Sequence, residues 1–257
     1  MKVHYITFIS KGEPIDKGIP LGHLKEKLEK KHQDHFDRVT VYTSEDVPYE
    51  HRREYDPEIF ETRFNHRYHN VGYGAFKPYL ILKTLQETDC DLVFYRDGNL
   101  DKGDVIIDGV EDFKKLGIAI LDTLKTDIFV PIENPYWAIG NTTPSIIFEK
   151  ILGSVEEKYV SYPQMNASLI ICKKTDYVKN FLVEWSEWMK HEEFFYREQH
   201  IKHANCNMNC GDQGVLNVMI LKEIRNGKLP EGFPWYGYVD RHFKTDKMYK
   251  IVNTKKL

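Results

Sequence analysis

Cysteine is scarce in this sequence, and long apolar runs and basic stretches are missing. Four cysteines occur in 257 residues. Because Cys90 and Cys172 lie beside or within expected buried strands, reduced thiols are favoured over a disulfide framework. No window holds roughly 18 or more consecutive apolar residues, so no transmembrane helix is predicted. The net charge of −3 comes without a basic tail or stripe, so no nucleic-acid partner is expected.

The remaining composition is typical of a soluble globular protein, with 41% hydrophobic and 29% charged residues. The N-terminal segment is too short, and too polar afterwards, for a signal peptide, so it predicts a core strand. The expected reduced thiols are typical of a cytoplasmic protein. The length suits one large α/β domain or two small ones.

Strand and helix patterns alternate along the chain, which predicts an α/β fold. Expected strands cover residues 3–9, 38–42, 92–95, 127–132 and 167–172, and expected helices cover apolar positions within 21–28, 79–85, 110–125, 148–152, 178–189 and 215–219. The first strand, helix and second strand fit within about forty residues, which is the βαβ spacing that implies parallel strands.

The stretch from Leu92 to Asn99 joins an expected buried strand to a polar turn. Gly98 allows unusual backbone angles at the break. Loops at the carboxyl ends of such strands are where open α/β sheets bind ligands. Asp97 and Asn99 offer hard oxygen ligands of the kind that Mg²⁺ or Mn²⁺ prefers. The same residues alone also describe an ordinary turn.

Four segments, in the same order, resemble nucleotide-sugar-dependent glycosyltransferases of the GT-A fold, of the type that builds surface polysaccharides or viral glycans. They are Gly72–Tyr79, Tyr95–Asn99, Gln164–Ser168 with the following helix, and Gly211–Asn217. The second stands at the place of the family's Asp-x-Asp motif, and the fourth resembles its Asp-Gln helix start. The resemblance extends from Val3 to about Asn217.

The resemblance implies a single GT-A domain over residues 1–257, Rossmann-like, with a mixed, mostly parallel central sheet flanked by helices. Residues 1–100 would form the nucleotide-binding half, and residues 101–257 the acceptor-side half and the C-terminal tail. The implied activity is transfer of a hexosyl or pentosyl group from a nucleotide sugar, a UDP-sugar, to a glycan hydroxyl.

A divalent cation, Mn²⁺ or Mg²⁺, is the implied cofactor, because it would neutralise the charge that develops on the leaving diphosphate. Its expected ligands are Asp97 and Asn99, with His242 completing the shell. A surface role for His242 is the alternative. The family's motif usually ends in a carboxylate. Asn99 brings no charge, so a lower metal affinity is expected, for which Asp101 could compensate.

Two lysines are expected near the phosphates. Lys77 would pair with a phosphate or with the Asp97 carboxylate, and Lys244 would do the same from the tail. A solvated surface lysine is the alternative for either residue, and for Lys244 neither role is favoured. The nucleobase is expected at the ends of the first two strands, near Ser10 and Tyr42.

On the acceptor side, Asp212 is the expected catalytic carboxylate. It would accept the proton of the attacking hydroxyl if the reaction inverts the anomeric centre. A helix N-cap is the alternative role of Asp212. Gln164, Asn166 and Gln213 are expected to hydrogen-bond sugar hydroxyls, with packing or turn roles as the alternatives.

Two histidines and two cysteines lie within eleven residues, at His200, His203, Cys206 and Cys210. They could supply a tetrahedral zinc site. Their spacing fits none of the familiar ligand patterns well, and the intervening asparagines favour a loop beside the cleft.

Three other functions stay open. A non-catalytic module that binds nucleotide sugars or glycans is compatible with the uncharged Asn99. An interaction protein organised by the His/Cys loop is the second. A metal-dependent nucleotidyltransferase is the third, although Ser10–Glu13 is a poor phosphate cradle because it is neither Gly-rich nor strongly basic.

Overall fold

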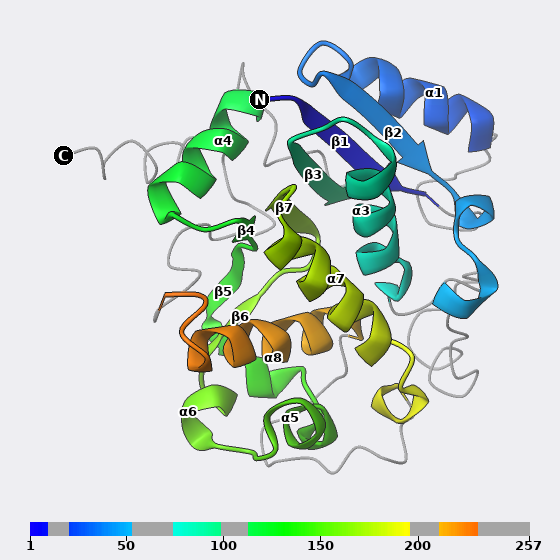
Figure 1. Cartoon of the computed structure of the whole chain (residues 1–257). Helices are drawn as coiled ribbons and strands as arrows, with labels where there is room; N and C mark the ends of the chain where they lie inside the picture. The colour runs from blue at the N-terminus through cyan, green and yellow to red at the C-terminus, as the bar shows by residue number, and fades with distance from the viewer. Residues whose placement is uncertain (10–20, 53–73, 99–112, 196–210, 231–257) are drawn as a thin grey trace.

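A five-stranded sheet forms the centre of the protein in the computed structural model, which describes residues 1–9, 21–52, 74–98, 113–195 and 211–230 (Figure 1). The strand order is β2-β1-β3-β7-β4. The strands are β1 (Val3–Phe8), β2 (Arg38–Tyr42), β3 (Leu92–Asp97), β4 (Ile128–Phe129) and β7 (Leu169–Lys173). β1 pairs in parallel with β2 and β3, while β7 is antiparallel to both of its neighbours. The predicted mixed, mostly parallel sheet is therefore confirmed.

Helices cover both faces of this sheet (Figure 1). They are α1 (Leu21–His32), α3 (Phe76–Glu87), α4 (Phe113–Leu124) and α7 (Asp176–Trp188). Alternate residues of β1 face opposite sides, so Val3 and Tyr5 join the apolar cluster that contains α4 residues, while Ile6 and Phe8 join the cluster that contains α3 and α7. Coverage of both faces fits the burial of every residue of β1, including the polar His4 and Thr7.

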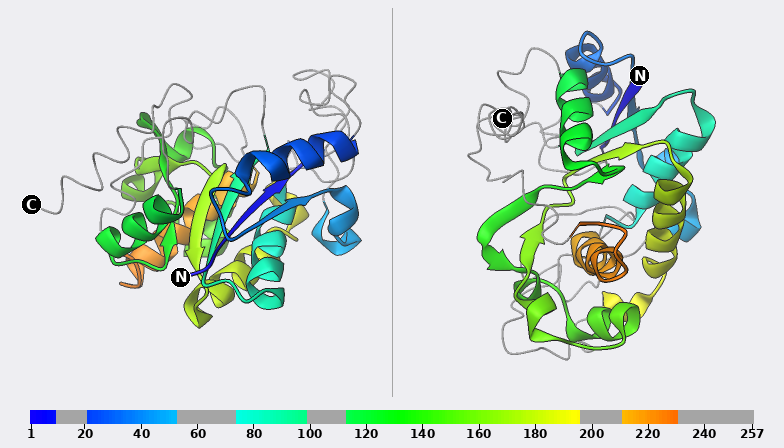
Figure 2. Two further views of the ribbon diagram at one scale, coloured as in Figure 1. Left: turned by 90° about the horizontal axis from the view of Figure 1, so that it is seen from above. Right: turned by 60° about the vertical axis from the view of Figure 1, so that its left-hand side comes forward.

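A second, two-stranded antiparallel sheet lies beside the central one. It consists of β5 (Ile132–Ala138) and β6 (Pro163–Met165). The other α-helices that the structure describes are α5 (Ser145–Leu152), α6 (Glu157–Val160) and α8 (Asp212–Arg225). The short 3-10 helices are η2 (Ser44–Asp46), η3 (Tyr49–His51), η6 (Ile139–Asn141) and η7 (Glu192–Phe194). α8 packs against α7, α5 and β6, as the right-hand view of Figure 2 shows. It thus joins the helical layer to the small sheet.

The prediction of one continuous strand over 127–132 is wrong, because this stretch belongs to two strands. β4 pairs with β7, whereas β5 begins at Ile132 and pairs with β6. Pro131 lies between them and has no N–H to continue a ladder. Its carbonyl instead accepts a hydrogen bond from Asn166 N at 2.8 Å. The sequence predicts no strand over β6, because three residues that start with proline give no strand pattern.

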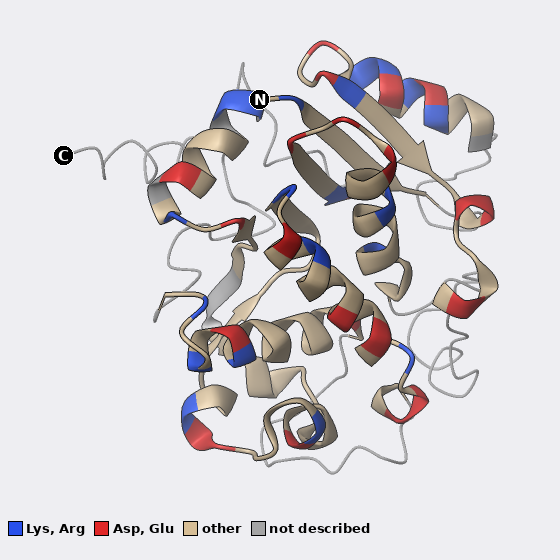
Figure 3. Ribbon diagram, viewed as in Figure 1, with Lys and Arg blue, Asp and Glu red and all other residues tan. Residues whose placement is uncertain are grey.

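The helix predicted over 178–189 is confirmed as α7, and Thr175 caps it. The Thr175 hydroxyl accepts a hydrogen bond from Val178 N at 3.3 Å. Acidic and basic residues are interspersed along α1 and α7 (Figure 3). Within the described ranges, no helix has both the length and the apolar character needed to cross a membrane.

Candidate functional site

The carboxyl end of β3 lies against the end of β1. Asp97 is the last residue of β3 and is in register with Phe8. Gly98 follows, and a Cβ built on it would lie 2.6 Å from the Phe8 carbonyl oxygen and 2.8 Å from Ile9 Cγ2. Because those distances exclude any side chain, glycine is needed for the turn after Asp97 to press against β1.

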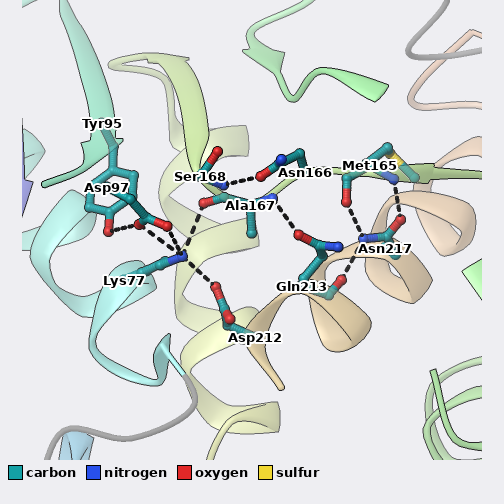
Figure 4. A network of polar contacts seen from close by, with 10 residues as sticks. All are labelled: Lys77, Tyr95, Asp97, Met165, Asn166, Ala167, Ser168, Asp212, Gln213 and Asn217. Carbon is teal, nitrogen blue, oxygen red and sulfur yellow. Dashed lines mark hydrogen bonds and ion pairs between the residues drawn. The ribbon is translucent and has the colours of Figure 1, made fainter. Parts of the chain in front are cut away.

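Lys77 links three parts of the chain at this point (Figure 4). Its ammonium nitrogen lies 3.0 Å from Asp97 Oδ1 and 2.8 Å from Asp212 Oδ2. It also donates a hydrogen bond of 3.2 Å to the carbonyl oxygen of Ala167. The Lys77 side chain is 8% exposed, so these contacts are largely shielded from water. The structure brings Lys77, Asp97 and Asp212 together, including the predicted contact between Lys77 and Asp97.

Burial and charge set the protonation of this cluster. Burial raises the pKa of Asp212, and the nearby Asp97 carboxylate adds to the rise, while the Lys77 ammonium opposes it; the resulting pKa is about 6. For Lys77, burial acts to lower the pKa, but the two carboxylates outweigh it and raise the pKa above its ordinary value. At neutral pH Lys77 is therefore charged, and Asp212 is a carboxylate close to its own titration.

Tyr95 also holds Asp97. Its hydroxyl donates a hydrogen bond of 2.6 Å to Asp97 Oδ1. Tyr95 has no role in the sequence-based prediction, although the period-two alternation of a strand places it on the same face as Asp97. The Asp97 side chain stays 39% exposed, compared with 12% for Asp212. One side of Asp97 is thus open to a ligand.

Gly74 lies against the Asp212 carboxylate. Its φ is +66°, and a Cβ built on it would lie 2.3 Å from Asp212 Cγ. The backbone ahead of α3 can approach the buried carboxylate only because residue 74 has no side chain. The sequence signal for this role is the Gly-Tyr-Gly run before Lys77.

Asp212 is the first residue of α8 and does not cap it. The N-cap position belongs to Gly211, whose φ is +50°. The alternative role of Asp212 as an N-cap is therefore wrong. Its carboxylate is directed instead to Lys77, from the first turn of the helix.

The expected sugar-binding residues make contacts within the protein. Asn166 Oδ1 accepts a hydrogen bond from Ser168 N at 2.7 Å, and Gln213 Oε1 accepts one from Ala167 N at 3.2 Å. Gln164 is buried in β6. These contacts support a short turn beside Lys77. Binding of sugar hydroxyls by Gln164, Asn166 and Gln213 stays a prediction.

Tyr42 lies at the end of β2, as expected, and is buried. Its hydroxyl is 2.9 Å from Thr84 Oγ1 of α3, and burial raises its pKa. A nucleotide contact of Tyr42 stays a prediction. Several other predicted residues lie outside the described ranges: Ser10, Asn99, Asp101, His200, His203, Cys206, Cys210, His242 and Lys244. Of the four cysteines, Cys90 and Cys172 are free and buried, as predicted.

Asp97 is the one expected metal ligand within the described ranges, which contain no group of three His, Cys, Asp or Glu side chains that could hold a metal ion. Its partly exposed carboxylate fits a hard divalent cation. Lys77, at 3.0 Å, would share that carboxylate with the metal. Asp97 therefore fits as one ligand of a metal site. The other expected ligands, Asn99 and His242, lie outside the described residues.

Comparison with known proteins finds structural similarity but no family match. No family model matches the chain, and no curated protein matches it in sequence. Among solved structures, the apo form of mouse xyloside xylosyltransferase 1 is similar to it, with a TM-score of 0.42 and 9% sequence identity. The similarity covers 89% of this chain and 84% of that chain.

Proposed function

We propose that the protein is a single-domain glycosyltransferase that moves a sugar from a UDP-sugar to a glycan hydroxyl. The observation that carries this proposal is the placement of Lys77 between Asp97, at the carboxyl end of β3, and Asp212, at the start of α8. That end of an open α/β sheet is where nucleotides bind. The cluster combines a cation, an exposed carboxylate and a buried carboxylate, and the motifs that carry the GT-A resemblance contain all three.

Asp212 is the proposed general base for a reaction that inverts the anomeric carbon. The acceptor oxygen forms a bond to that carbon while the bond to the diphosphate oxygen breaks, and the hydroxyl proton passes to Asp212. A pKa of about 6 suits this step, because the group is ionised at neutral pH yet basic enough to take a proton. Burial of Asp212 keeps competing water away from it.

Lys77 and Asp97 are the proposed donor-side residues. The Lys77 ammonium stabilises negative charge next to the leaving diphosphate. Asp97, Asn99 and His242 are the proposed ligands of Mn²⁺ or Mg²⁺, which when bound would neutralise part of the diphosphate charge. Tyr95 and Gly98 hold Asp97 in place for either contact.

Calorimetric titration tests the donor half of the proposal. UDP should bind in the presence of Mn²⁺, more tightly than GDP or ADP, and Asp97→Ala should abolish the Mn²⁺-dependent part. Asp122→Ala is the matched control, because Asp122 is an exposed carboxylate of α4 that pairs with Lys173. It should bind UDP like the wild type. Failure of every nucleoside diphosphate to bind, with and without Mn²⁺, would end the glycosyltransferase proposal.

A product assay with a panel of UDP-sugars tests the transfer half. Asp212→Asn should lower the turnover number by a factor of about 100 or more, which is the usual contribution of a general base, and should leave UDP binding intact. Binding without any transfer by the wild type would instead support a non-catalytic nucleotide-sugar or glycan-binding module. Release of pyrophosphate from a nucleoside triphosphate would support a nucleotidyltransferase.

A further inference from the structure

Asn217 binds a neighbouring stretch of main chain through both ends of its side-chain amide. Its Oδ1 accepts a hydrogen bond from Met165 N at 2.7 Å, and its Nδ2 donates one to Met165 O at 3.0 Å (Figure 4). Asn217 is fully buried on α8, and Met165 ends β6. The Asn217 amide thus pairs with both the N–H and the C=O of Met165, as the backbone of a neighbouring β-strand would.

The turn that follows Met165 reaches both sides of the candidate site. Ala167 N donates to Gln213 Oε1, and Ala167 O accepts from Lys77 Nζ, each at 3.2 Å. Ser168 O accepts from Asp97 N at 2.9 Å. Residues 165–168, hereafter the 165–168 turn, therefore contact α8 on one side and Lys77 and Asp97 on the other.

The ammonium of Lys77 has three N–H donors and no acceptor. Three acceptor groups surround it: the carboxylates of Asp97 and Asp212 and the carbonyl of Ala167. Of these, the Ala167 carbonyl is the neutral one, and its position is set by the turn. A lysine side chain is flexible, so the ammonium is fixed only while its acceptors are fixed.

We propose that Asn217 is a positioning residue for the transfer reaction: it anchors the 165–168 turn to α8 and thereby holds Lys77 between Asp97 and Asp212. This inference rests on the proposed function. Asn217 touches neither of the two carboxylates in any hydrogen bond that the structure describes. It acts through the backbone of residues 165–168.

The position of Lys77 controls the charge on Asp212. The charged side chains that face Asp212 within the described ranges are Lys77 from α3, which lowers its pKa, and Asp97 from β3, which raises it. If the turn loosens, Lys77 loses an acceptor and moves, while Asp97 stays on its strand. The pKa of Asp212 then rises, because an opposite charge within a few ångström lowers the pKa of an acid by about 1–3 units.

The test follows Asp212 directly. Carboxyl carbons of aspartate are labelled with ¹³C, the Asp212 resonance is assigned with Asp212→Asn, and its titration is compared between the wild type and Asn217→Ala. We expect the pKa to rise by about one unit in Asn217→Ala. In the product assay, the acidic limb of the pH–rate profile should move to higher pH by the same amount.

Two further variants keep the test decisive. Asn217→Leu keeps the branched side chain of four heavy atoms but has no hydrogen-bonding group, so it should shift the pKa of Asp212 in the same direction even if Asn217→Ala unfolds. Val218→Ala is the control, because it truncates a buried neighbour on α8 and should leave the Asp212 titration as it is in the wild type. A shift of less than about 0.3 unit in a folded Asn217 variant would overturn the proposal.

The titration does not depend on turnover, so the two proposals can fail separately. If the wild type transfers no sugar but the Asn217 variants shift Asp212, the proposed reaction is wrong and the anchoring of the turn is right. If the wild type transfers sugar and the folded Asn217 variants titrate like it, the positioning role is wrong and the proposed function stands.

Discussion

One ammonium group serves two carboxylates in the candidate site. Lys77 lies 3.0 Å from Asp97 Oδ1 and 2.8 Å from Asp212 Oδ2. Of the two acids, Asp212 is the more buried, so it bears the larger cost of being charged. Its raised pKa is the physical consequence, and the same property that suits a base makes the native protein less stable at neutral pH.

Replacement of Asp212 should therefore stabilise the protein. An acid whose pKa rises from 3.8 to about 6 on folding binds more protons in the native state between those values, so stability falls as the pH rises through that window. Asp212→Asn removes the charge and should add up to about 3 kcal/mol to the free energy of unfolding at pH 7.5. Urea unfolding measures the gain, which should disappear near pH 4.

The exposed Asp176 of α7 provides the control for that experiment. Asp176→Asn should change the free energy of unfolding by less than about 0.5 kcal/mol at either pH. A loss of stability in Asp212→Asn at pH 7.5 would show that the attraction to Lys77 exceeds the cost of burying the carboxylate.

Glycine at position 74 is needed for contact as well as for conformation. Gly74→Ala should lose about 1–2 kcal/mol of stability through its positive φ. It should also displace Asp212, because the added Cβ would lie 2.3 Å from Asp212 Cγ. A displacement on the order of 1 Å should lower the proposed transfer activity about 100-fold.

Gly153→Ala separates the two effects. Gly153 has a similar φ of +78°, and no atom lies within 4 Å of a Cβ built there. It should lose the same stability and keep full transfer activity in the product assay. Equal activity of the two variants would contradict the contact between residue 74 and Asp212.

At the scale of elements, α8 is the helix that positions several side chains of the candidate site. Its first turn carries Asp212 and Gln213, its second turn carries Asn217, and all three are engaged with other elements. Gly214 lets the helix approach Thr143, since a Cβ there would lie 3.3 Å from Thr143 Oγ1. The helix is buried along most of its length, which suits a part that must hold side chains in fixed places.

α4, by contrast, packs on the opposite face of the sheet, and its Gly117 has space for a methyl group. A Cβ built on Gly117 would lie 3.5 Å from Phe94 Cδ2 and 3.7 Å from Ile171 Cγ2, which are ordinary packing distances. Gly117→Ala should therefore raise the free energy of unfolding by about 0.5–1 kcal/mol through helix propensity. Thermal unfolding would measure the gain, and UDP binding should not change.

Gly22→Ala in α1 is the comparison, because no atom lies within 4 Å of a Cβ built there. It should give a gain of the same sign from propensity alone. A loss in Gly117→Ala beside a gain in Gly22→Ala would mean that α4 cannot accept the extra methyl group against β3 and β7.

At the scale of the whole molecule, the central sheet carries a buried histidine whose titration opposes that of Asp212. Burial, with a smaller effect of the Arg38 charge, lowers the pKa of His4 from 6.5 to about 4. Its Nε2 lies 2.8 Å from Thr40 Oγ1, between neighbouring strands. The unfolded chain therefore binds the proton first as the pH falls, so the native state loses stability between about pH 6.5 and 4.

His4→Gln should remove this pH dependence. The wild type should lose about 2 kcal/mol of its free energy of unfolding through His4 when the pH falls from 7.5 to 5, and the His4→Gln variant should not. Urea unfolding at the two pH values measures the difference. The opposite change is expected for Asp212→Asn, whose advantage over the wild type shrinks over the same interval. A His4→Gln variant that follows the wild type at both pH values would show that His4 does not stay neutral in the native state.

The sequence by itself determined the order of the five strands of the central sheet and of the helices that flank it. The motifs that carry the GT-A resemblance supplied the mostly parallel sheet and the candidates Lys77, Asp97 and Asp212. These come from short-range information: apolar periodicity, turn residues and motifs that occupy a few consecutive positions. The break at Pro131 and the short strand β6 escaped prediction, because their pairing depends on partners distant in the chain.

Only the tertiary structure decided how the candidates act together. That Lys77 touches both carboxylates, that Gly74 lies against Asp212, and that Asn217 holds the 165–168 turn are long-range contacts with no signature in a local pattern. The raised pKa of Asp212 follows from burial, which exists only once α3, β3 and α8 have packed together. Sequence patterns report local preference, whereas desolvation and charge pairing depend on which distant residues meet.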